Sequence, residues 1–504
     1  MDPVSQSISG SLLCYIPRRE SLLRAEESLD VILPDRFPDA SEILSVSGRA
    51  VIKGYDRSSG SWSILLIAEL RALFLSDSGE TRILSAEIPV TVKSSLEGGE
   101  DGVPRGEAAL IGKEARIVNS RKLSFSVSVE AALSVFLPHT AAGAPPEENG
   151  VVTKTAEREI LARTVFAVER FTLRDDLALS AGSGPFGTVI WQECLLSVIE
   201  CKTIHEKIVM RAAAKIRAAT MNESGIPESV EFELPFTRVF EIAGADEDCA
   251  SFVRLSPGKL DLAPVGEEGK RAVSVTLEAE AGIECFRKTA YRYAEDAYGL
   301  SSELSLHRET LLLPVERSEE EAEERFLDAV EFPFDPESIH LFRAELSPVR
   351  VFGNDEGRLR LETTLEAEFL YNAEGRMHAL KKSFPVKREL AWDGGNASAE
   401  AILQTSRFTL PAMRKSEIEA TILFRIVREE DLEVSFVTGW DVGSETAEDL
   451  PSYRILTPGK DISLFSLAKM THSSPALIAE ANGLSPDGDA PGGRLLLIPV
   501  VKGK

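Results

Sequence analysis

The stretch of sequence that decides the fold is Arg358-Leu359-Arg360-Leu361-Glu362-Thr363-Thr364-Leu365-Glu366-Ala367-Glu368-Phe369, in which apolar and polar side chains alternate. Successive side chains of a β-strand point to opposite faces of the sheet, so a period of two predicts a strand with one buried and one exposed face. Two other runs, residues 61–74 and 207–219, are also rich in apolar and β-branched side chains. The sequence therefore predicts a mainly β protein.

Each of these runs is followed by a turn sequence that ends in glycine and, ten residues after that glycine, by a proline. The pairs are Gly79 and Pro89, Gly225 and Pro235, and Gly375 and Pro385. Glycine supplies the positive φ that a tight hairpin turn needs. Proline cannot donate a ladder hydrogen bond, so the returning strand is expected at a sheet edge. The offsets of 146 and 150 residues between the prolines predict three copies of one β unit rather than a chance coincidence of turns and prolines.

These copies divide the chain into domains. A further strand is expected to close each unit, at residues 123–129, 272–277 and 418–424. We predict an N-terminal segment at 1–30, three tandem β-sandwich-like repeats at 31–150, 155–315 and 326–445, and a small C-terminal α+β domain at 452–500.

The predicted linkers follow from local composition. Residues 138–150 are rich in Pro, Gly and Ala, and residues 443–451 separate the third repeat from the C-terminal domain. Between the second and third repeats, residues 314–325 contain the acidic run Ser318-Glu319-Glu320-Glu321-Ala322-Glu323-Glu324. A run of like charges is usually solvated, so we expect an exposed helix or tether there rather than a recognition tail.

The charge of the chain restricts its partners. The 504 residues carry a formal net charge of −25, which argues against nucleic-acid binding because phosphate contacts need clustered Lys and Arg. The acidity is uneven: residues 453–504 carry +2, and the 452 residues before them carry −27. The slightly basic C-terminal domain is therefore the expected docking end.

The sequence also indicates a cellular compartment. No stretch approaches the ~20 continuous apolar residues of a membrane span, and the N-terminus lacks a basic region followed by an apolar core. The five cysteines are odd in number and scattered, which is typical of buried thiols in a reducing cytosol. We expect a cytoplasmic protein without membrane insertion.

From Tyr453 the pattern changes to strand, helix, helix, strand. Residues 462–469 have apolar side chains at roughly helical spacing. Ser473 or Ser474, followed by Pro475, is expected to begin a second helix, which Asn482-Gly483 ends. Gly493 then leads into a closing strand.

This C-terminal pattern resembles a LysM domain. The residues that match the LysM pattern are Tyr453, Gly459, Leu467, Ala468, Asn482, Gly493, Leu496, Ile498 and Pro499. The usual Gly-Asp-Thr turn is interrupted here as Gly459-Lys460-Asp461-Ile462, and Thr471-His472 stands where an aromatic residue and a glycine are common. LysM domains generally bind N-acetylglucosamine polymers in a groove between the first loop and the loop after the second helix. The resemblance thus implies seven candidate binding residues: Gly459, Lys460, Asp461, Ile462, Asn482, Gly483 and Leu484. Asn482 and the glycines have an alternative role as purely structural caps.

Nearly the whole chain resembles the spore-coat morphogenetic proteins that combine SPOCS repeats with a C-terminal LysM domain. Glu231-Phe232-Glu233-Leu234-Pro235-Phe236 is similar to the acidic-x-apolar-Pro-Phe sequence of SPOCS repeats, and Glu295-Asp296-Ala297-Tyr298 contains their Asp-Ala-Tyr motif. The resemblance implies a non-enzymatic scaffold that binds the basement-layer ATPase of the coat (stage IV sporulation protein A) through the LysM domain. It also implies contacts with other coat proteins, encasement of the forespore, and a place in the mother cell at the forespore surface. It implies no catalytic residue and no cofactor.

Two other functions stay open. The first is a peptidoglycan-binding adaptor; the missing export signal favours the scaffold over it. The second is an enzyme with LysM as its targeting domain, but the six histidines show no metal-ligand spacing and there is no Walker loop. Residues 182–187 satisfy Gly-x-Gly-x-x-Gly, yet a strand is expected after them where a dinucleotide site needs a helix. Cys194 and Cys201 are expected as core thiols rather than metal ligands.

Overall fold

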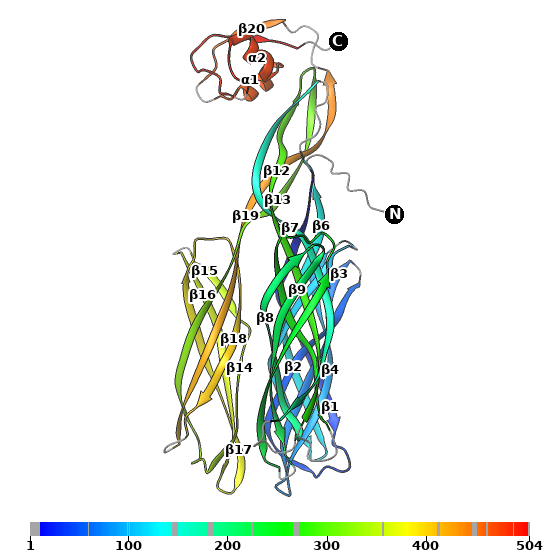
Figure 1. The fold of residues 1–504 in the computed structure, drawn as a ribbon, viewed down its shortest axis with the longest axis vertical. Coiled ribbons are helices and arrows are strands. Elements are labelled where there is room, and N and C mark those ends of the chain that lie inside the picture. Colours follow the sequence, from blue (N-terminus) through cyan, green and yellow to red (C-terminus); the bar gives the residue numbers. More distant parts are fainter. Residues whose placement is uncertain are drawn as a thin grey trace.

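The computed structural model describes residues 11–58, 60–97, 99, 101–143, 150–179, 186–222, 225–265, 272–354, 357–410, 414–445, 451–459, 462–486 and 488–501. Long antiparallel strands dominate this part of the chain, which confirms the mainly β class. The strands run side by side along the long axis of the molecule, and a small C-terminal module lies at one end (Figure 1). Lys460, Asp461 and residues 182–185 fall outside the described residues.

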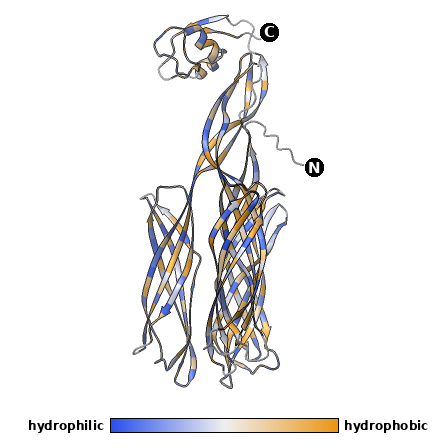
Figure 2. Ribbon diagram, viewed as in Figure 1, coloured by the Kyte–Doolittle hydropathy of each residue, from blue (hydrophilic) through white to orange (hydrophobic). Residues whose placement is uncertain are grey.

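The first unit contains six strands in two three-stranded sheets, of order β1-β6-β5 and β2-β3-β4. The strands are β1 (Leu12–Ile32), β2 (Ala40–Ser58), β3 (Ser61–Ser76), β4 (Thr81–Glu97), β5 (Val103–Asn119) and β6 (Lys122–Ala141). Buried side chains from both sheets, among them Ile64, Phe74 and Phe125, form one apolar core. Hydrophobic and hydrophilic residues alternate along the strands (Figure 2), as a two-layer sandwich requires.

The second unit repeats this arrangement, with sheets of order β11-β12-β7 and β10-β9-β8. Its strands are β7 (Val151–Ala178), β8 (Thr188–Ile204), β9 (Lys207–Met221), β10 (Pro227–Glu241), β11 (Ala250–Val265) and β12 (Ala272–Gly299). In both units the first strand pairs with the last, and the last strand pairs with the last but one.

The third unit has the same order in its β13-β19-β18 sheet, but two shorter strands, β14 and β15, stand where the other units have one. Its strands are β13 (Ser302–Glu331), β14 (Ser338–Leu346), β15 (Arg350–Asn354), β16 (Arg358–Ala373), β17 (Arg376–Ala391), β18 (Asn396–Phe408) and β19 (Lys415–Glu445). The alternating stretch at residues 358–369 lies in β16, which pairs with β14, β15 and β17.

The repeated glycines and prolines have their predicted places. Gly79, Gly225 and Gly375 have φ values of 81°, 75° and 75°. Each sits in the turn between two paired strands of its unit. Pro89, Pro235 and Pro385 lie on β4, β10 and β17, which are edge strands. The missing N–H of each proline therefore breaks no ladder on a second side.

The predicted domain boundaries differ from the strands in the structure. The boundary at residue 31 falls inside β1, which pairs with β6 over nearly its whole length, so the segment before it belongs to the first unit. The boundary at 315 falls inside β13, the first strand of the third unit. Likewise β6 runs to Ala141 and β19 to Glu445, into the predicted linkers. In each case the partner strand is distant in sequence, so local composition does not indicate where the strand begins or ends.

The predicted acidic tether is wrong, because residues 318–324 are part of β13. Arginines of β19, which pairs with β13, and of β17 in the other sheet of the unit compensate its charge. Arg428 and Arg425 of β19 lie 2.6 Å from Glu320 and 3.2 Å from Glu321, and Arg388 of β17 lies 3.1 Å from Glu324. Opposite charges on adjacent strands stabilise the pairing of a strand that would otherwise repel itself.

The three units meet at the carboxylate of Glu429 on β19, which is only 8% exposed. Arg19 of the first unit donates to it at 3.2 Å, Arg163 of the second at 3.0 Å, and Arg317 of the third at 2.9 Å. Burial acts to raise the pKa of Glu429, but the attraction of Arg163, Arg19 and Arg317 outweighs it and lowers the pKa. Glu284 of β12 adds a second carboxylate, 2.7 Å from Arg163.

A second junction surrounds Glu345 on β14. Its carboxylate lies 2.5 Å from Nζ of Lys113 in the first unit and accepts a 2.8 Å hydrogen bond from the indole of Trp191 in the second. Arg343, also of the third unit, lies 3.4 Å away. Trp191 belongs to an apolar cluster that includes residues of all three units, such as Leu73 and Leu370. The sandwiches therefore pack against one another and are not independent domains joined by linkers.

Long strands continue beyond the sandwiches as a stalk that leads toward the C-terminal module (Figure 1). They are β7, β12, β13 and β19, paired as β7 with β12 and β13 with β19. At the base of the stalk a cluster from all three units is buried, with Tyr291, Tyr293 and Phe436 at its centre and Leu12 and Cys14 contributed by β1. The stalk is thus rooted in the junction of the three units.

Replacing Glu429 tests the first junction. Glu429→Gln keeps the size of the side chain but removes one of two counter-charges from each of the buried Arg163 and Arg317, which retain Glu284 and Glu319. Removal of one partner of a buried ion pair typically costs about 3–5 kcal/mol, and the retained carboxylates place the expected cost at or below that range. Urea denaturation should show that loss in the free energy of unfolding. Glu417→Gln, at an exposed position of the same strand, is the matched control and should change stability by no more than about 0.5 kcal/mol. Equal stability of the two variants would contradict the role given to Glu429.

Acid titration tests the second junction. Burial would raise the pKa of Glu345, but Arg343 and Lys113 outweigh it and lower the pKa from 4.5 to about 2. Because the folded-state pKa is lowered, the ionised carboxylate stabilises the fold above pH 4.5, and this contribution is lost as the pH falls toward 2. Glu345→Gln should therefore flatten the fall in stability over that range. An unchanged slope in this variant, measured by denaturation at each pH, would refute the assignment.

Candidate protein-docking site

The C-terminal module has the predicted strand–helix–helix–strand order. Its elements are β20 (Tyr453–Leu456), α1 (Leu464–Thr471), α2 (Pro475–Asn482) and β21 (Leu496–Pro499). Ser463 caps α1 by accepting a hydrogen bond from the N–H of Ser466, and Ser474 caps α2 in the same way from Leu477. Gly483 ends α2 at a φ of 66°, a conformation that glycine adopts without strain. The two helices and one face of the β20–β21 pair enclose a small apolar core.

The tip of the second unit completes this core. Tyr298, at the end of β12, is only 6% exposed and packs among Leu464, Leu467 and Ile478 of the module. Its ring meets that of Phe465 edge to face at 5.2 Å, and its hydroxyl donates to the backbone oxygen of Ser473 at 2.8 Å. Burial raises the pKa of Tyr298. The module is therefore anchored by a side chain from outside its own sequence.

An ion pair strengthens the anchor. Asp296 of β12 lies 2.6 Å from Nζ of Lys469 on α1 and 3.2 Å from Arg308 of β13. Asp296, Ala297 and Tyr298 are the Asp-Ala-Tyr motif of the sequence, so this motif joins the stalk to the module. The second unit holds the module, although the third unit precedes it in the chain.

The loop-groove residues predicted from the sequence have mainly structural contacts. Ile462 is half-buried against the module core, and its carbonyl accepts a hydrogen bond from Ala490 at 2.8 Å. Leu484 is also half-buried against that core. Gly459 is exposed, with space for a Cβ that would lie 3.5 Å from the nearest atom of Ile462. Ile462 and Leu484 thus meet the same core, while the placement of Lys460 and Asp461 is outside the described residues.

Asn482 is a clamp within the module. Its side-chain amide donates to the carbonyls of Ile478 at 2.8 Å and Leu497 at 2.6 Å, and its oxygen accepts from the N–H of Leu497 at 2.9 Å. These bonds tie the end of α2 to the outer edge of β21. Of the two roles open for Asn482, the structural one accounts for all three bonds.

The sequence reasoning missed an apolar surface on the other side of the sheet. Leu456, Leu496 and Ile498 point into the core, so the alternate residues of the two strands point outward. The outward residues include Tyr453, Ile455, Leu495 and Leu497, which are 61%, 70%, 68% and 37% exposed. Ile455 and Leu497 stand directly opposite each other in the ladder. We call these four residues the apolar strand face.

Two basic residues flank the apolar strand face. Arg454 lies between Tyr453 and Ile455 on β20 but stands opposite Ile498, so it projects from the other face of the sheet, and Arg494 lies just before β21; neither has an ion pair within the part of the chain that the structure describes. Contiguous exposed apolar side chains with charged neighbours are typical of a surface that binds another protein.

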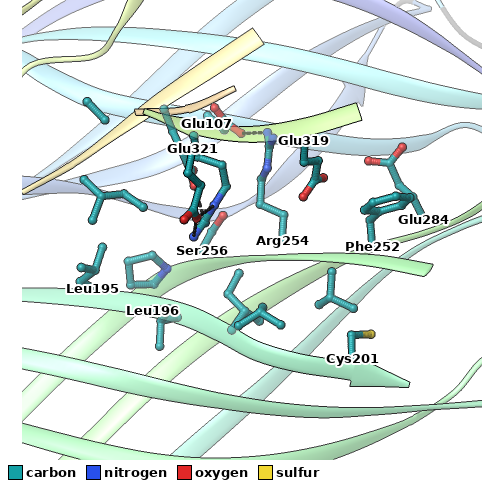
Figure 3. Close-up of a pocket in the computed structure, with 18 of the residues that line it drawn as sticks. Glu107, Leu195, Leu196, Cys201, Phe252, Arg254, Ser256, Glu284, Glu319 and Glu321 are labelled. Carbon is teal, nitrogen blue, oxygen red and sulfur yellow. Dashed lines mark hydrogen bonds and ion pairs between the residues drawn. The ribbon is translucent and has the colours of Figure 1, made fainter. Parts of the chain in front are cut away.

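A cavity of about 520 Å³ lies between the second and third units, and Glu107 of the first unit also lines it (Figure 3). Five glutamates and three arginines line it together with apolar residues of β8 and β11: Glu107, Glu284, Glu319, Glu321, Glu400, Arg254, Arg317 and Arg425. The arginines are paired with the glutamates, for example Arg254 with Glu107 at 3.2 Å and Arg425 with Glu400 at 2.8 Å. Burial would raise the pKa of Glu107, but Arg254 and Arg105 outweigh it and lower the pKa. The cavity is a seam between units, and the charges of its lining residues largely compensate one another. No local sequence pattern predicts it.

Cys194 and Cys201 lie beside this seam. Burial raises the pKa of Cys194 to about 12 and also raises that of Cys201. A thiolate, not a thiol, is the nucleophile and metal ligand, so neither is prepared for either role at neutral pH. All five cysteines are free.

Within the described residues, no group of three or more His, Cys, Asp or Glu side chains is arranged to hold a metal ion. Neither α1 nor α2, the helices of that same part of the chain, has the length of a membrane span. Comparisons of the chain with protein-family models, with curated proteins and with solved structures found no match.

Substitution of Tyr298 tests the anchor of the module. Tyr298→Ala removes a buried ring and should destabilise the module by about 3–5 kcal/mol, whereas Tyr298→Phe loses one hydrogen bond and should cost about 1 kcal/mol. Hydrogen exchange of the α1 and α2 amides in the full chain measures both effects. Tyr453→Ala, which removes an exposed tyrosine of the same module, should leave these amides protected. Fast exchange in all three variants, or in none, would show that Tyr298 is not the anchor.

Proposed function

We propose that this protein is a non-enzymatic scaffold that presents a protein-binding module at the end of an acidic, three-unit β array. The three sandwiches correspond in this proposal to SPOCS repeats, and the C-terminal module to a LysM domain. Its partner through the module is the basement-layer ATPase of the spore coat, stage IV sporulation protein A, and other coat proteins bind the array. The protein then acts in the mother cell, at the forespore surface, to promote encasement of the forespore.

The observation that carries the proposal is the apolar strand face on a module that is fixed in place. Tyr298 and the Asp296–Lys469 pair hold the module against the stalk. A fixed module presents its surface in one orientation, so binding does not have to pay the entropy of ordering it. Enzymatic function needs a different kind of feature, such as an activated nucleophile or a paired acid and base. The pKa of the Cys194 thiol, beside the seam between the units, is raised instead.

The charge distribution supports the same proposal. The array that carries −27 discourages non-specific association, whereas the C-terminal 52 residues carry +2 and attract acidic surfaces. Several binding units in one rigid chain also permit avidity, so that weak contacts can sustain a shell.

Capture by the full-length chain tests the function. The immobilised protein should retain the purified ATPase, and the chain should remain in the supernatant when purified peptidoglycan is sedimented. The double variant Ile455→Gln/Leu495→Gln should weaken ATPase capture by about tenfold or more, since it removes two apolar contacts from the interface.

Leu327→Gln is the matched control, because Leu327 is 66% exposed but lies on β13 of the array. It should bind the ATPase as the unaltered chain does. Sedimentation with peptidoglycan without capture of the ATPase would overturn the proposal and favour the glycan-binding adaptor.

A further inference from the structure

The two outer edges of the C-terminal sheet are not equivalent. Asn482 closes the edge of β21, because its amide donates to the carbonyl of Leu497 and accepts from the N–H of the same residue, as a neighbouring strand would. In the described part of the chain, β20 pairs only with β21, so its other edge has no strand partner. An open edge of this kind is a template for another strand.

The side chains beside the open edge are apolar. Tyr453 and Ile455 alternate along β20 on the outer face, and Leu497 continues that face on β21. A strand that pairs with β20 places every second side chain directly beside Tyr453 and Ile455. Apolar residues at those alternate positions would be removed from water together with the apolar strand face.

The charge at this edge selects the remaining position. Arg454 lies between Tyr453 and Ile455 on β20, on the opposite face of the strand, and has no ion pair among the described residues. An acidic side chain at the alternate position of an added strand complements Arg454. A second copy of the chain would instead bring the Arg454 side chains of the two copies toward each other, which opposes self-pairing through β20.

We propose that β20 captures an extended segment of its protein partner as a third strand of the C-terminal sheet, and that this segment alternates apolar with acidic residues. The proposal rests on the proposed protein-binding role of the module and names its mode of binding. The loop groove at residues 459–462 and 482–484 is not the contact surface in this mode.

A peptide titration tests the proposal without any natural partner. The probe is a fluorescein-labelled peptide of alternating valine and glutamate, compared with one of alternating valine and serine, and binding to the full chain is measured by fluorescence polarisation. The valine–glutamate peptide should bind about tenfold more tightly than the valine–serine peptide, although the array as a whole repels it.

Variants identify the site of peptide binding. Ile455→Gln should weaken both peptides about tenfold, and Arg454→Glu should abolish the preference for glutamate. The controls Leu327→Gln and Arg376→Glu, at exposed positions of the array, should change neither. The proposal is overturned if the two peptides bind equally, if neither binds at about 1 mM, or if Ile455→Gln has no effect.

Hydrogen exchange with the ATPase separates this proposal from the proposed function. In a complex, the amides of residues 453–456 should gain protection while the 482–484 segment stays unchanged. Capture of the ATPase with protection only at the loops would overturn strand addition and leave the scaffold function standing. Peptide binding without ATPase capture would support strand addition and overturn the proposed scaffold function. Concentration-dependent self-association that Ile455→Gln abolishes would identify a second copy as the occupant and overturn the proposal.

Discussion

The carboxylate of Glu429 accepts hydrogen bonds from one arginine of each β unit, and the arrangement of the three sandwiches depends on it. Arg19, Arg163 and Arg317 occupy comparable places on the first strands of their units, shortly after the apolar residues Ile16, Ile160 and Leu313. Those apolar residues enter the cluster at the base of the stalk. Charge and apolar packing therefore act on neighbouring residues of the same three strands, so that the junction and the stalk stabilise each other. Burying Arg163 and Arg317 is costly, and the buried carboxylate of Glu429, together with that of Glu284, offsets this cost.

Sequence patterns predict those features of this fold that depend on residues close together in the chain. The turn glycines and edge prolines lie within a single hairpin, so Gly375 and Pro385 predict their own surroundings. The first strand of each unit was harder to place, because its partner is the last strand of the unit; β1 was divided at residue 31 for this reason. The acidic run in β13 was misread because its compensation comes from Arg425 and Arg428 on another strand. Nothing in the sequence distinguishes Glu429 from the other acidic residues until the units are assembled.

In the candidate site, too, the sequence predicts features set by nearby residues and misses those set by distant ones. The capping serines and Gly483 follow from local rules, and the order of the module's elements was predicted correctly. Asn482 was a candidate ligand because it matches a family pattern, but its bonds to Leu497 show a clamp. The apolar strand face had a signal that was available: Leu495-Leu496-Leu497-Ile498 is apolar on both faces of a strand whose sheet has helices on one side only. The docking of Tyr298 had no local signal, since it depends on where the stalk ends.

The hydrogen bond between Arg19 and Glu429 also limits how early the newly made chain can assemble. The two residues are 410 positions apart, and at 5–20 residues per second a ribosome needs roughly 20–80 s to pass from one to the other. The first two units are synthesised within that interval, and until it ends Arg19 and Arg163 lack their shared partner, Glu429. Tyr298 likewise precedes its acceptor, Ser473, by 175 positions. The junction and the anchor of the module thus form only after Glu429 and Ser473 have been made, and a nascent chain that ends before them has neither the shared carboxylate for Arg19 and Arg163 nor the module that packs on Tyr298.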